Sequence, residues 1–321
     1  MKRACVGVIA ALCLILGWQT VRAEYPEKAI TCIVPMAPGG AADISVRMLA
    51  DALGKELGQP LAIVNKGGGS GIPGLNFGLK AANDGYTVIG GAIGNALVAT
   101  RFLKAPEYNL DDIVFVGGYM PQDRLLLARP DKPWKTWQEF IDYARKHPGT
   151  VSVGSGASQE GLEVVRSAGI RDGAKMKYVM YKSGGQATAD LLGGHIDAAE
   201  LGVGTAGYQA ARKGDLIVLA NLGTAEVPHF PNVPKLRDLG YPFSTSLMYG
   251  FVFPKGTPEA VRARWEKALK AVLQNPEVIA KMEAAGFVPQ FLTGKEYADF
   301  SRHAVDSVQK MLKYNEQDSG K

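Results

Sequence analysis

Cysteine and histidine are scarce in this chain of 321 residues, which contains three cysteines and four histidines. Cys5 and Cys13 lie in the apolar N-terminal segment, so Cys32 is the single thiol in the rest of the sequence. A lone thiol cannot form an internal disulfide, and no histidine close in sequence would activate it. We therefore predict that Cys32, in the strand-like stretch ITCIVP, is a buried apolar side chain.

The sequence also lacks the usual motifs of metal, nucleotide and nucleic-acid sites. The histidines show no metal-ligand spacing, and neither H-E-x-x-H nor a Walker A sequence occurs. G-x-G-x-x-G occurs at 69–74 and 202–207, but neither copy is followed at the expected distance by the acidic residue of a dinucleotide site. No basic stripe or aromatic ladder is present. We expect no metal, no cofactor and no nucleic-acid partner.

The first 23 residues have the pattern of a secretory signal peptide. A basic start (MKR) precedes the apolar run ACVGVIAALCLILGW, and VRA supplies small residues before a cleavage site after Ala23. A membrane anchor is the alternative, but the run is shorter than the roughly 20 residues of a spanning helix. Lipidation at Cys13 would cut the apolar run in half. Cleavage of residues 1–23 lowers the formal net charge from +5 to +2, and we expect the mature protein in the periplasm.

Beyond the signal peptide, short β-rich runs alternate with longer helical patterns. AITCIVP is followed by ADISVRMLADALGKELG, in which Ile44, Leu49 and Leu53 recur at helical spacing. This alternation is typical of βα units and parallel sheet, so the fold class is α/β. About 300 mature residues favour two domains. The helices of the final 65 residues need a sheet to pack on.

Glycine-rich turns stand at several strand-to-helix junctions: APGGAAD (37–43), NKGGGSGIPG (65–74) and GSGASQE (154–160), with KSGGQ (182–186) and GVGTAG (202–207) resembling them. Free N–H groups and the positive end of the helix dipole coincide at such a junction, which favours anion binding without a charged side chain. A single turn of this kind is most simply a tight turn. Several in one α/β protein indicate a shared anion site.

Hydrolytic chemistry is not indicated. GASQE comes close to G-x-S-x-G, but Glu160 replaces the glycine of the nucleophile elbow, so Ser158 is interpreted as a helix cap or ligand donor. A secreted hydrolase that uses Ser158 remains the enzyme alternative. An exported, two-domain α/β protein that holds an anion without transforming it fits the description of a solute receptor, and not of an enzyme.

The motifs resemble those of the extracytoplasmic solute receptors of tripartite tricarboxylate transporters (Bug/TctC-like proteins). VPMAPGGAAD with Arg47 is similar to the family's first signature, and LGQPLAIVNKGGGSG to its second loop. NDGYTV, KTWQEFIDYARKHPG, YKSGGQATADLLGGHID, FPNVPKLRDLGYP and GFVFPKGTPE follow in the family's order. Gly67 stands where the family usually has proline, Gly69 for alanine and Ser70 for glycine, and Ala41 replaces a common serine or threonine.

The resemblance implies a type II periplasmic-binding-protein fold, with two α/β lobes and a small carboxylate in the cleft between them. RLLLARP and YGFVFP would be the two crossing strands, so lobe 1 is expected over 24–124 and 252–321 and lobe 2 over 125–251. The last helices would then return to the sheet of lobe 1. The implied partners are integral membrane subunits of a tripartite transporter, served by a monomeric receptor. A carboxylate sensor for a signalling protein is the alternative.

We expect main-chain donors and hydroxyls of both lobes to hold the ligand, with no single basic side chain indispensable, since only Lys66 and Lys182 lie near the signatures. Asp43 should orient its loop, because like charges repel. Glu200 either meets a ligand amine or faces solvent. The predicted ligand-binding residues are Pro38, Gly39, Gly40, Ala41, Ala42, Asp43, Gly68, Gly69, Ser70 and Asn95 in lobe 1, and Ser155, Gly156, Ala157, Ser158, Tyr181, Lys182, Ser183 and Glu200 in lobe 2.

Overall fold

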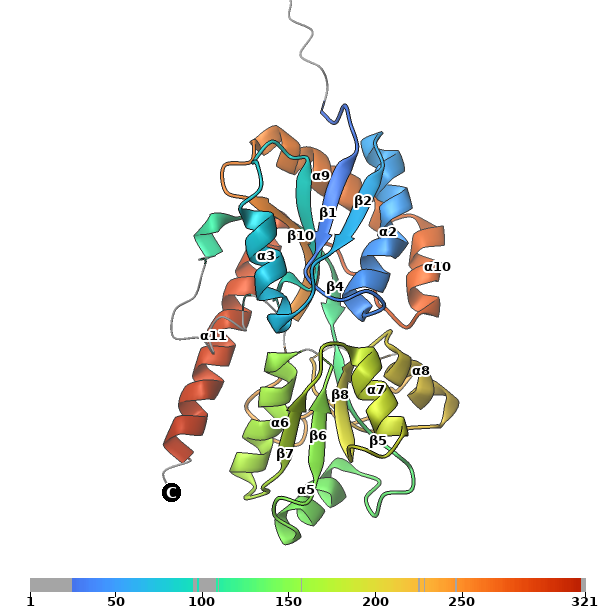
Figure 1. Cartoon of the computed structure of the whole chain (residues 1–321), viewed down its shortest axis with the longest axis vertical. Coiled ribbons are helices and arrows are strands. Elements are labelled where there is room, and N and C mark those ends of the chain that lie inside the picture. The colour runs from blue at the N-terminus through green and yellow to red at the C-terminus, as the bar shows by residue number, and fades with distance from the viewer. Residues whose placement is uncertain are drawn as a thin grey trace, which may run out of the picture.

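The computed structural model shows two α/β lobes, one above the other (Figure 1). It describes residues 25–94, 97, 108, 110–156, 158–224, 226–227, 229–245 and 247–318. The predicted signal peptide, 1–23, lies outside the described residues. No helix in the described part of the chain is both long and apolar enough to span a membrane.

The first lobe is built on a six-stranded sheet of order β11-β4-β10-β3-β1-β2. Its strands are β1 (Ile30–Val34), β2 (Leu61–Asn65), β3 (Thr87–Gly91), β4 (Ile113–Gln122), β10 (Leu247–Pro254) and β11 (Leu292–Thr293). The first three are parallel to one another, and β10 pairs antiparallel with β3 and β4. Cys32 is fully buried in β1, as predicted, and burial raises the pKa of its thiol to about 12.

Helices cover both faces of this sheet: α2 (Ala41–Leu57), α3 (Ile72–Leu79), α9 (Glu259–Leu273), α10 (Pro276–Ala284) and α11 (Gly294–Asp318), with the short turns η1 (Gly69–Gly71) and η3 (Leu110–Asp112). α2 buries Val46, Leu49 and Leu53, which are the apolar positions of its helical pattern. As predicted, α9 and α11 return to the first sheet, where both pack on β4.

The second lobe has a five-stranded sheet of order β7-β6-β8-β5-β9. Its strands are β5 (Arg124–Ala128), β6 (Ser152–Ser155), β7 (Lys177–Met180), β8 (Ala198–Gly202) and β9 (Ile217–Asn221). Its helices are α5 (Trp137–Lys146), α6 (Gln159–Arg171), α7 (Gly184–Leu192) and α8 (Ala206–Lys213). β6, β7 and β8 are parallel, and their carboxyl ends point toward the first lobe (Figure 1).

The chain passes between the sheets at Asp123, where β4 ends in one lobe and β5 begins in the other. The predicted crossing segment RLLLARP therefore forms β5 itself, at the start of the second lobe. The predicted limit at 251–252 falls inside β10, whose first residues already pair with β4 of the first sheet.

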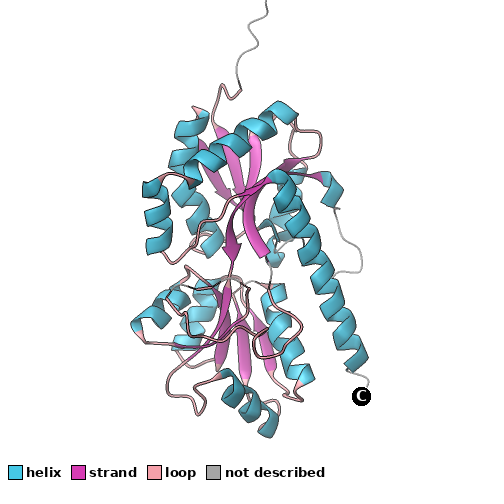
Figure 2. Ribbon diagram, turned by 180° about the vertical axis from the view of Figure 1, so that it is seen from behind, coloured by secondary structure: helices cyan, strands magenta, loops and turns pink. Residues whose placement is uncertain are grey.

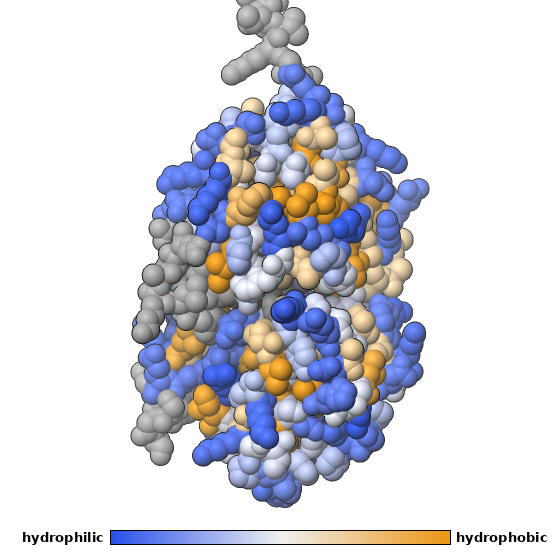
Figure 3. Space-filling view, viewed as in Figure 1, coloured by the Kyte–Doolittle hydropathy of each residue, from blue (hydrophilic) through white to orange (hydrophobic). Residues whose placement is uncertain are grey.

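α11 adds a third connection between the lobes that the sequence reading did not anticipate. It runs from the first lobe down the side of the second (Figure 2), where Asn315 donates to Glu163 and Ser167 of α6, each at 2.9 Å. On the molecular surface, hydrophilic side chains follow the outline of both lobes, and apolar ones gather over the middle of the upper lobe (Figure 3).

Candidate functional site

A small cavity of about 40 Å³ lies between the lobes, beyond the carboxyl ends of β1, β6 and β8. In open α/β sheets this is the usual place of a ligand site. The cavity is lined by Met36, Ala37, Gly40, Ala41, Ala42, Ala92 and Tyr249 from the first lobe and by Arg124, Gly156, Lys182, Ser183, Gly184, Gly202 and Thr205 from the second.

The two lobes touch beside this cavity. A Cβ atom added to Gly202 of the second lobe would lie 3.9 Å from the Cβ atom of Ala41 in the first, which is ordinary van der Waals contact. The enclosed space has room for about three water molecules, at roughly 10–15 Å³ each. The cavity in this structure therefore fits a compact ligand.

On the first-lobe side, one carboxylate organises the loop between β1 and α2. Asp43 is buried and accepts hydrogen bonds from the Gly39 N–H, from Arg47 Nε and from Asn65 Nδ2, each at 2.9 Å. Burial acts to raise the pKa of Asp43, but the bonds from Arg47, Gly39 and Asn65 outweigh it and lower the pKa. Asp43 is thus ionised and orients the loop, which is the role expected for it.

The helix that follows this loop, α2, begins without a side-chain cap. Gly40 is the N-cap residue of the 17-residue helix α2 and has no side chain to offer. Within the described residues, no acceptor is assigned to the N–H groups of Ala41 and Ala42, which lie at the cavity wall. Two unpaired donors and the positive end of the helix dipole therefore meet at this wall, as an anion site requires.

Three helices of the second lobe begin on this side of the molecule, two of them at the cavity wall, and each is capped by a hydroxyl. Ser158 accepts from the Gly161 N–H at 3.1 Å, Ser183 from the Gln186 N–H at 3.3 Å and Thr205 from the Tyr208 N–H at 3.5 Å. These helices are α6, α7 and α8. The starts of α7 and α8 bring two more positive dipole ends to the cavity wall, and α6 begins behind it, each with part of its N–H groups already satisfied.

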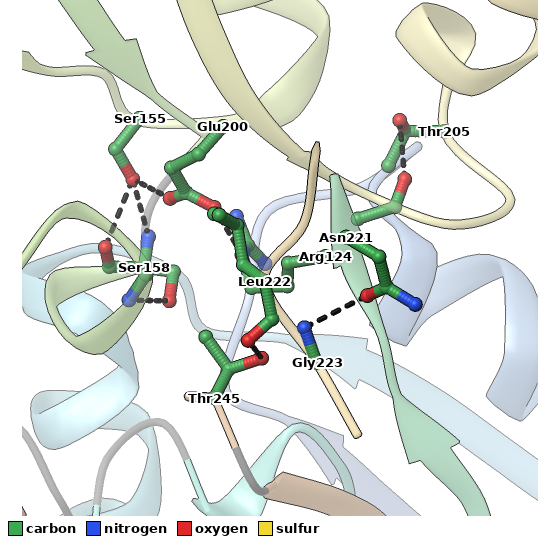
Figure 4. A network of polar contacts seen from close by, with 11 residues as sticks. Arg124, Ser155, Ser158, Glu200, Thr205, Asn221, Leu222, Gly223 and Thr245 are labelled. Atoms are coloured by element: carbon green, nitrogen blue, oxygen red, sulfur yellow. Dashed lines mark hydrogen bonds and ion pairs between the residues drawn. The ribbon is translucent and has the colours of Figure 1, made fainter. Parts of the chain in front are cut away.

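The buried charged residue of the cavity lining is Arg124, the first residue of β5 (Figure 4). Its Nε donates to Glu200 on β8, and the other carboxylate oxygen of Glu200 accepts from the Ser155 hydroxyl. Burial opposes it, but the attraction of Glu200 raises the pKa of Arg124. Burial raises the pKa of Glu200, against the opposing effects of Arg124 and Ser155. A buried cation is thus held at the cavity wall.

Six predicted residues line the cavity: Gly40, Ala41, Ala42, Gly156, Lys182 and Ser183. Asn95 and Ala157 lie outside the described residues. The remaining predicted residues do not line it. In the first lobe, Pro38, Gly39 and Asp43 belong to the first loop, and Gly68, Gly69 and Ser70 belong to the second. In the second lobe, the Tyr181 hydroxyl donates to Asp190, and Ser155, Ser158 and Glu200 are buried behind the wall. The solvent-facing alternative for Glu200 is wrong, because its exposed fraction is 0%.

Position 67, where the related family usually has proline, leaves no space for a side chain in this structure, which explains the glycine. A Cβ atom on Gly67 would lie 2.5 Å from the backbone nitrogen of Ala37, a distance that real Cβ atoms essentially never show. The second glycine-rich loop therefore packs directly against the backbone of a cavity-lining residue. It supports the wall rather than forming it.

The sequence reading missed Arg124, Thr205 and Tyr249. Arg124 was assigned to an apolar crossing strand, although an arginine in front of LLLA was a signal, since a charge that enters a buried strand needs a partner. Thr205 lies in the turn GVGTAG, which was recognised as glycine-rich but not included in the site. Tyr249 had no sequence signal, because it comes from β10 at the far end of the chain.

The two lobes and their shared cavity define a periplasmic solute-binding protein of the two-lobed type. Residues 45–316 match the family model described as the tripartite tricarboxylate transporter family receptor, and the chain belongs to this family. The resemblance inferred from the motifs is thereby confirmed.

Individual relatives agree over nearly the whole chain. Protein BugT of Bordetella pertussis is 31% identical over 291 residues, which cover 89% of this chain and 88% of the relative. A solved structure described as a periplasmic transporter is 30% identical, with a TM-score of 0.83 over 90% of this chain and 97% of its own. A MatC protein of Rhodopseudomonas palustris, solved with bound malate, is 25% identical, with a TM-score of 0.81 over 90% and 100% of the two chains.

Proposed function

We propose that this receptor binds a small carboxylate in the cavity between its lobes and delivers it to the membrane subunits of a tripartite transporter. The observation that supports this most directly is the convergence of three helix N-termini on one cavity, those of α7 and α8 and the uncapped start of α2. Each such terminus stabilises an anion by about 0.3–1 kcal/mol, and by up to about 2 kcal/mol where it is partly buried.

The carboxylate-bound relative supports the ligand class. The MatC protein was solved with malate, and its similarity to this chain covers 90% of the chain. Within the described residues, no cluster of histidine, cysteine, aspartate or glutamate could hold a metal ion. Ser158 has no histidine partner among its hydrogen bonds and serves as the cap of α6. A receptor therefore accounts for the site better than a hydrolase.

The localisation and oligomeric state belong to the same proposal. The mature protein begins after Ala23, resides in the periplasm and acts as a monomer that presents its closed form to the membrane subunits. Mass spectrometry of exported protein tests the cleavage after Ala23. We expect a mature N-terminus at Glu24, and a retained Met1 or a lipid on Cys13 would contradict this.

A thermal-shift screen of the mature protein tests the ligand class. Acetate, malonate, succinate, malate, citrate and benzoate are compared with ribose and lysine, since a ligand that binds only the folded state raises the melting temperature. We expect carboxylates alone to stabilise the protein. A shift with ribose or lysine and none with any carboxylate would refute the proposal.

Substitutions of Gly40 test whether the carboxylate binds at the start of α2. Its φ of −80° suits any residue, and an added Cβ atom would lie 3.6 Å from the Ala37 carbonyl oxygen, so Gly40→Ala should fold normally. The two branches of Gly40→Val would enter the cavity and displace the anion. We expect Gly40→Val to lose carboxylate binding by about 100-fold or more and Gly40→Ala by much less, because only the branched side chain blocks both amides.

A further inference from the structure

Arg124 has more hydrogen-bonding capacity than the protein uses. Its exposed fraction is 4%, and its Nε alone is engaged, by Glu200. The terminal nitrogen Nη2 is buried and has no partner among the described residues. A buried donor without an acceptor costs about 1–3 kcal/mol, and more when the group is charged. Because Arg124 also lines the cavity, an acceptor on the ligand would relieve this cost.

The position of the guanidinium is fixed from behind. Glu200 is fully buried between Arg124 and the Ser155 hydroxyl, as Figure 4 shows. Gly161, in the first turn of α6, leaves the space for this pair. A Cβ atom there would lie 2.5 Å from Glu200 Oε2 and 2.9 Å from Arg124 Nε. The Nε edge is therefore occupied by protein, whereas Nη2 has no acceptor among the described residues.

Tyr249 of the first lobe adds a second unused donor. Its exposed fraction is 4%, it lines the cavity, and no hydrogen bond to its hydroxyl is found in the described part of the chain. Burial raises the pKa of Tyr249 to about 12, so the phenol keeps its proton at neutral pH. The cavity thus has the bare amides of Ala41 and Ala42 on one wall and the donors of Arg124 and Tyr249 elsewhere on its lining.

We propose that Arg124 and Tyr249 bind a second carboxylate of the ligand, so that the receptor selects short dicarboxylates. This inference rests on the proposed function, in which the first carboxylate binds at Ala41 and Ala42. A guanidinium presents parallel N–H groups that match the two oxygens of a carboxylate. The cavity of about 40 Å³ limits the spacer, which favours a diacid of three or four carbons over a longer one.

The charges around the cavity are compatible with a dianion. Arg124 is balanced by Glu200, and Glu160, which is also buried, adds a negative charge near Arg124. Lys182 at the cavity edge and the N-termini of α2, α7 and α8, each worth roughly half a positive charge, oppose these groups. The dianion is thus held mainly by directed donors and helix ends, with a small net charge from side chains.

Calorimetry with malonate and propanoate tests the proposal, because both have three carbons and they differ in the second carboxylate. We expect wild-type protein to bind malonate about 100-fold more tightly than propanoate, since a charge-assisted pair of hydrogen bonds is lost. Arg124→Met should remove this preference, and Tyr249→Phe should weaken malonate binding about 5-fold. The control Arg129→Met should change neither affinity, because Arg129 pairs with Asp131 and lies outside the cavity lining.

Arg124→Met leaves Glu200 unpaired, so a second variant keeps the test decisive if it does not fold. Arg124→Met combined with Glu200→Gln removes both charges, which avoids an isolated buried carboxylate. Retained preference for malonate in either folded variant overturns the proposal, as does tighter binding of adipate than of malonate by wild-type protein. If Gly40→Val loses malonate in the same assay, the proposed function stands even when this inference fails. Absence of binding of every carboxylate by wild-type protein overturns both.

Discussion

The two walls of the cavity hold helix N-termini in opposite ways. In the first lobe, α2 begins at Gly40 without a side-chain cap, and the carboxylate of Asp43 accepts a hydrogen bond from the preceding loop instead of capping the helix. In the second lobe, α6, α7 and α8 are capped by their own hydroxyls, and the unused donors come instead from Arg124. One wall therefore offers bare main chain, and the other offers a side chain. The difference suggests a division of labour for the proposed ligand, in which main-chain amides bind any carboxylate and a side chain selects among them.

After Gly40→Val, the largest effect is expected at Asp43, the single group on which the shape of the first wall depends. Asp43→Asn removes the charge that binds the Gly39 N–H, Arg47 and Asn65 together, so the loop should lose its shape. We expect a loss of about 1–3 kcal/mol in stability and at least 10-fold in carboxylate affinity. Calorimetry and thermal unfolding measure both. Asp51→Asn is the matched control, because Asp51 is exposed on the same helix.

The sign of the pH dependence follows from the lowered pKa of Asp43. A carboxyl group whose pKa is depressed on folding stabilises the protein above its unfolded pKa, and this contribution disappears as the pH falls through the folded value. The difference in stability between wild type and Asp43→Asn should therefore be full at pH 7 and shrink in the acid range below the ordinary aspartate pKa. A difference that grows toward acid would contradict this role.

A smaller effect is expected from the hydroxyls of the second wall. Ser155 and Ser158 are buried, and their hydroxyls hold Glu200, the loop and the start of α6. Changing both to alanine should cost about 1–2 kcal/mol of stability through the lost cap and hydrogen bonds. Affinity for the carboxylate should fall by less than in Asp43→Asn. A larger fall would show that these hydroxyls touch the ligand, as the sequence reading had expected.

Two lysines should matter less still. Lys66 lies over the ring of Phe77 at 4.0 Å and does not line the cavity, and Lys182 is exposed at the cavity edge. Exposed charges contribute little, so Lys66→Ala and Lys182→Ala should each weaken carboxylate binding by no more than about 5-fold. Dissociation constants at fixed ionic strength decide this. Complete loss of binding in either variant would place the anion on a lysine rather than on the helix ends.

The smallest effect concerns the contact between α11 and α6, far from the cavity. Burial raises the pKa of Glu163, whose carboxylate accepts from Asn315 at 2.9 Å. Its stabilising contribution is present below the ordinary glutamate pKa and is lost as the pH rises through the raised value. Glu163→Gln keeps the acceptor and removes the charge, so it should raise the melting temperature by about 1–3 °C at pH 8 and leave it unchanged at pH 4. Equal shifts at both pH values would contradict this explanation.

The fold could be predicted because its signals are local and periodic. The apolar positions of α2, the turn after each strand and the capping residue Thr293, whose hydroxyl accepts from the Glu296 N–H, are all readable from neighbouring residues. The order of the motifs also gave the family. The path of α11 could not be predicted, because its contact with α6 joins residues about 150 positions apart.

The site was predictable on one wall and not on the other. Gly40, Ala41 and Ala42 follow from a glycine pair between a strand and a helix, because uncapped amides have a sequence signature. For Arg124 the sequence shows a charge at the start of a buried strand, but its partners could not be predicted, since Glu200 and Gly161 come from different elements. The serines near 155 looked like donors because sequence shows a hydroxyl but not the partner that already occupies it.

A titration followed by amide NMR tests the central claim most directly. Protein labelled with ¹⁵N is titrated with the carboxylate that gives the largest thermal stabilisation, and the signals of Ala41 and Ala42 are followed. The account predicts large downfield shifts of both amides that saturate with the dissociation constant measured by calorimetry, because each N–H gains a carboxylate acceptor. If the ligand saturates the protein while both amides keep their positions, the anion is bound elsewhere and the account is wrong.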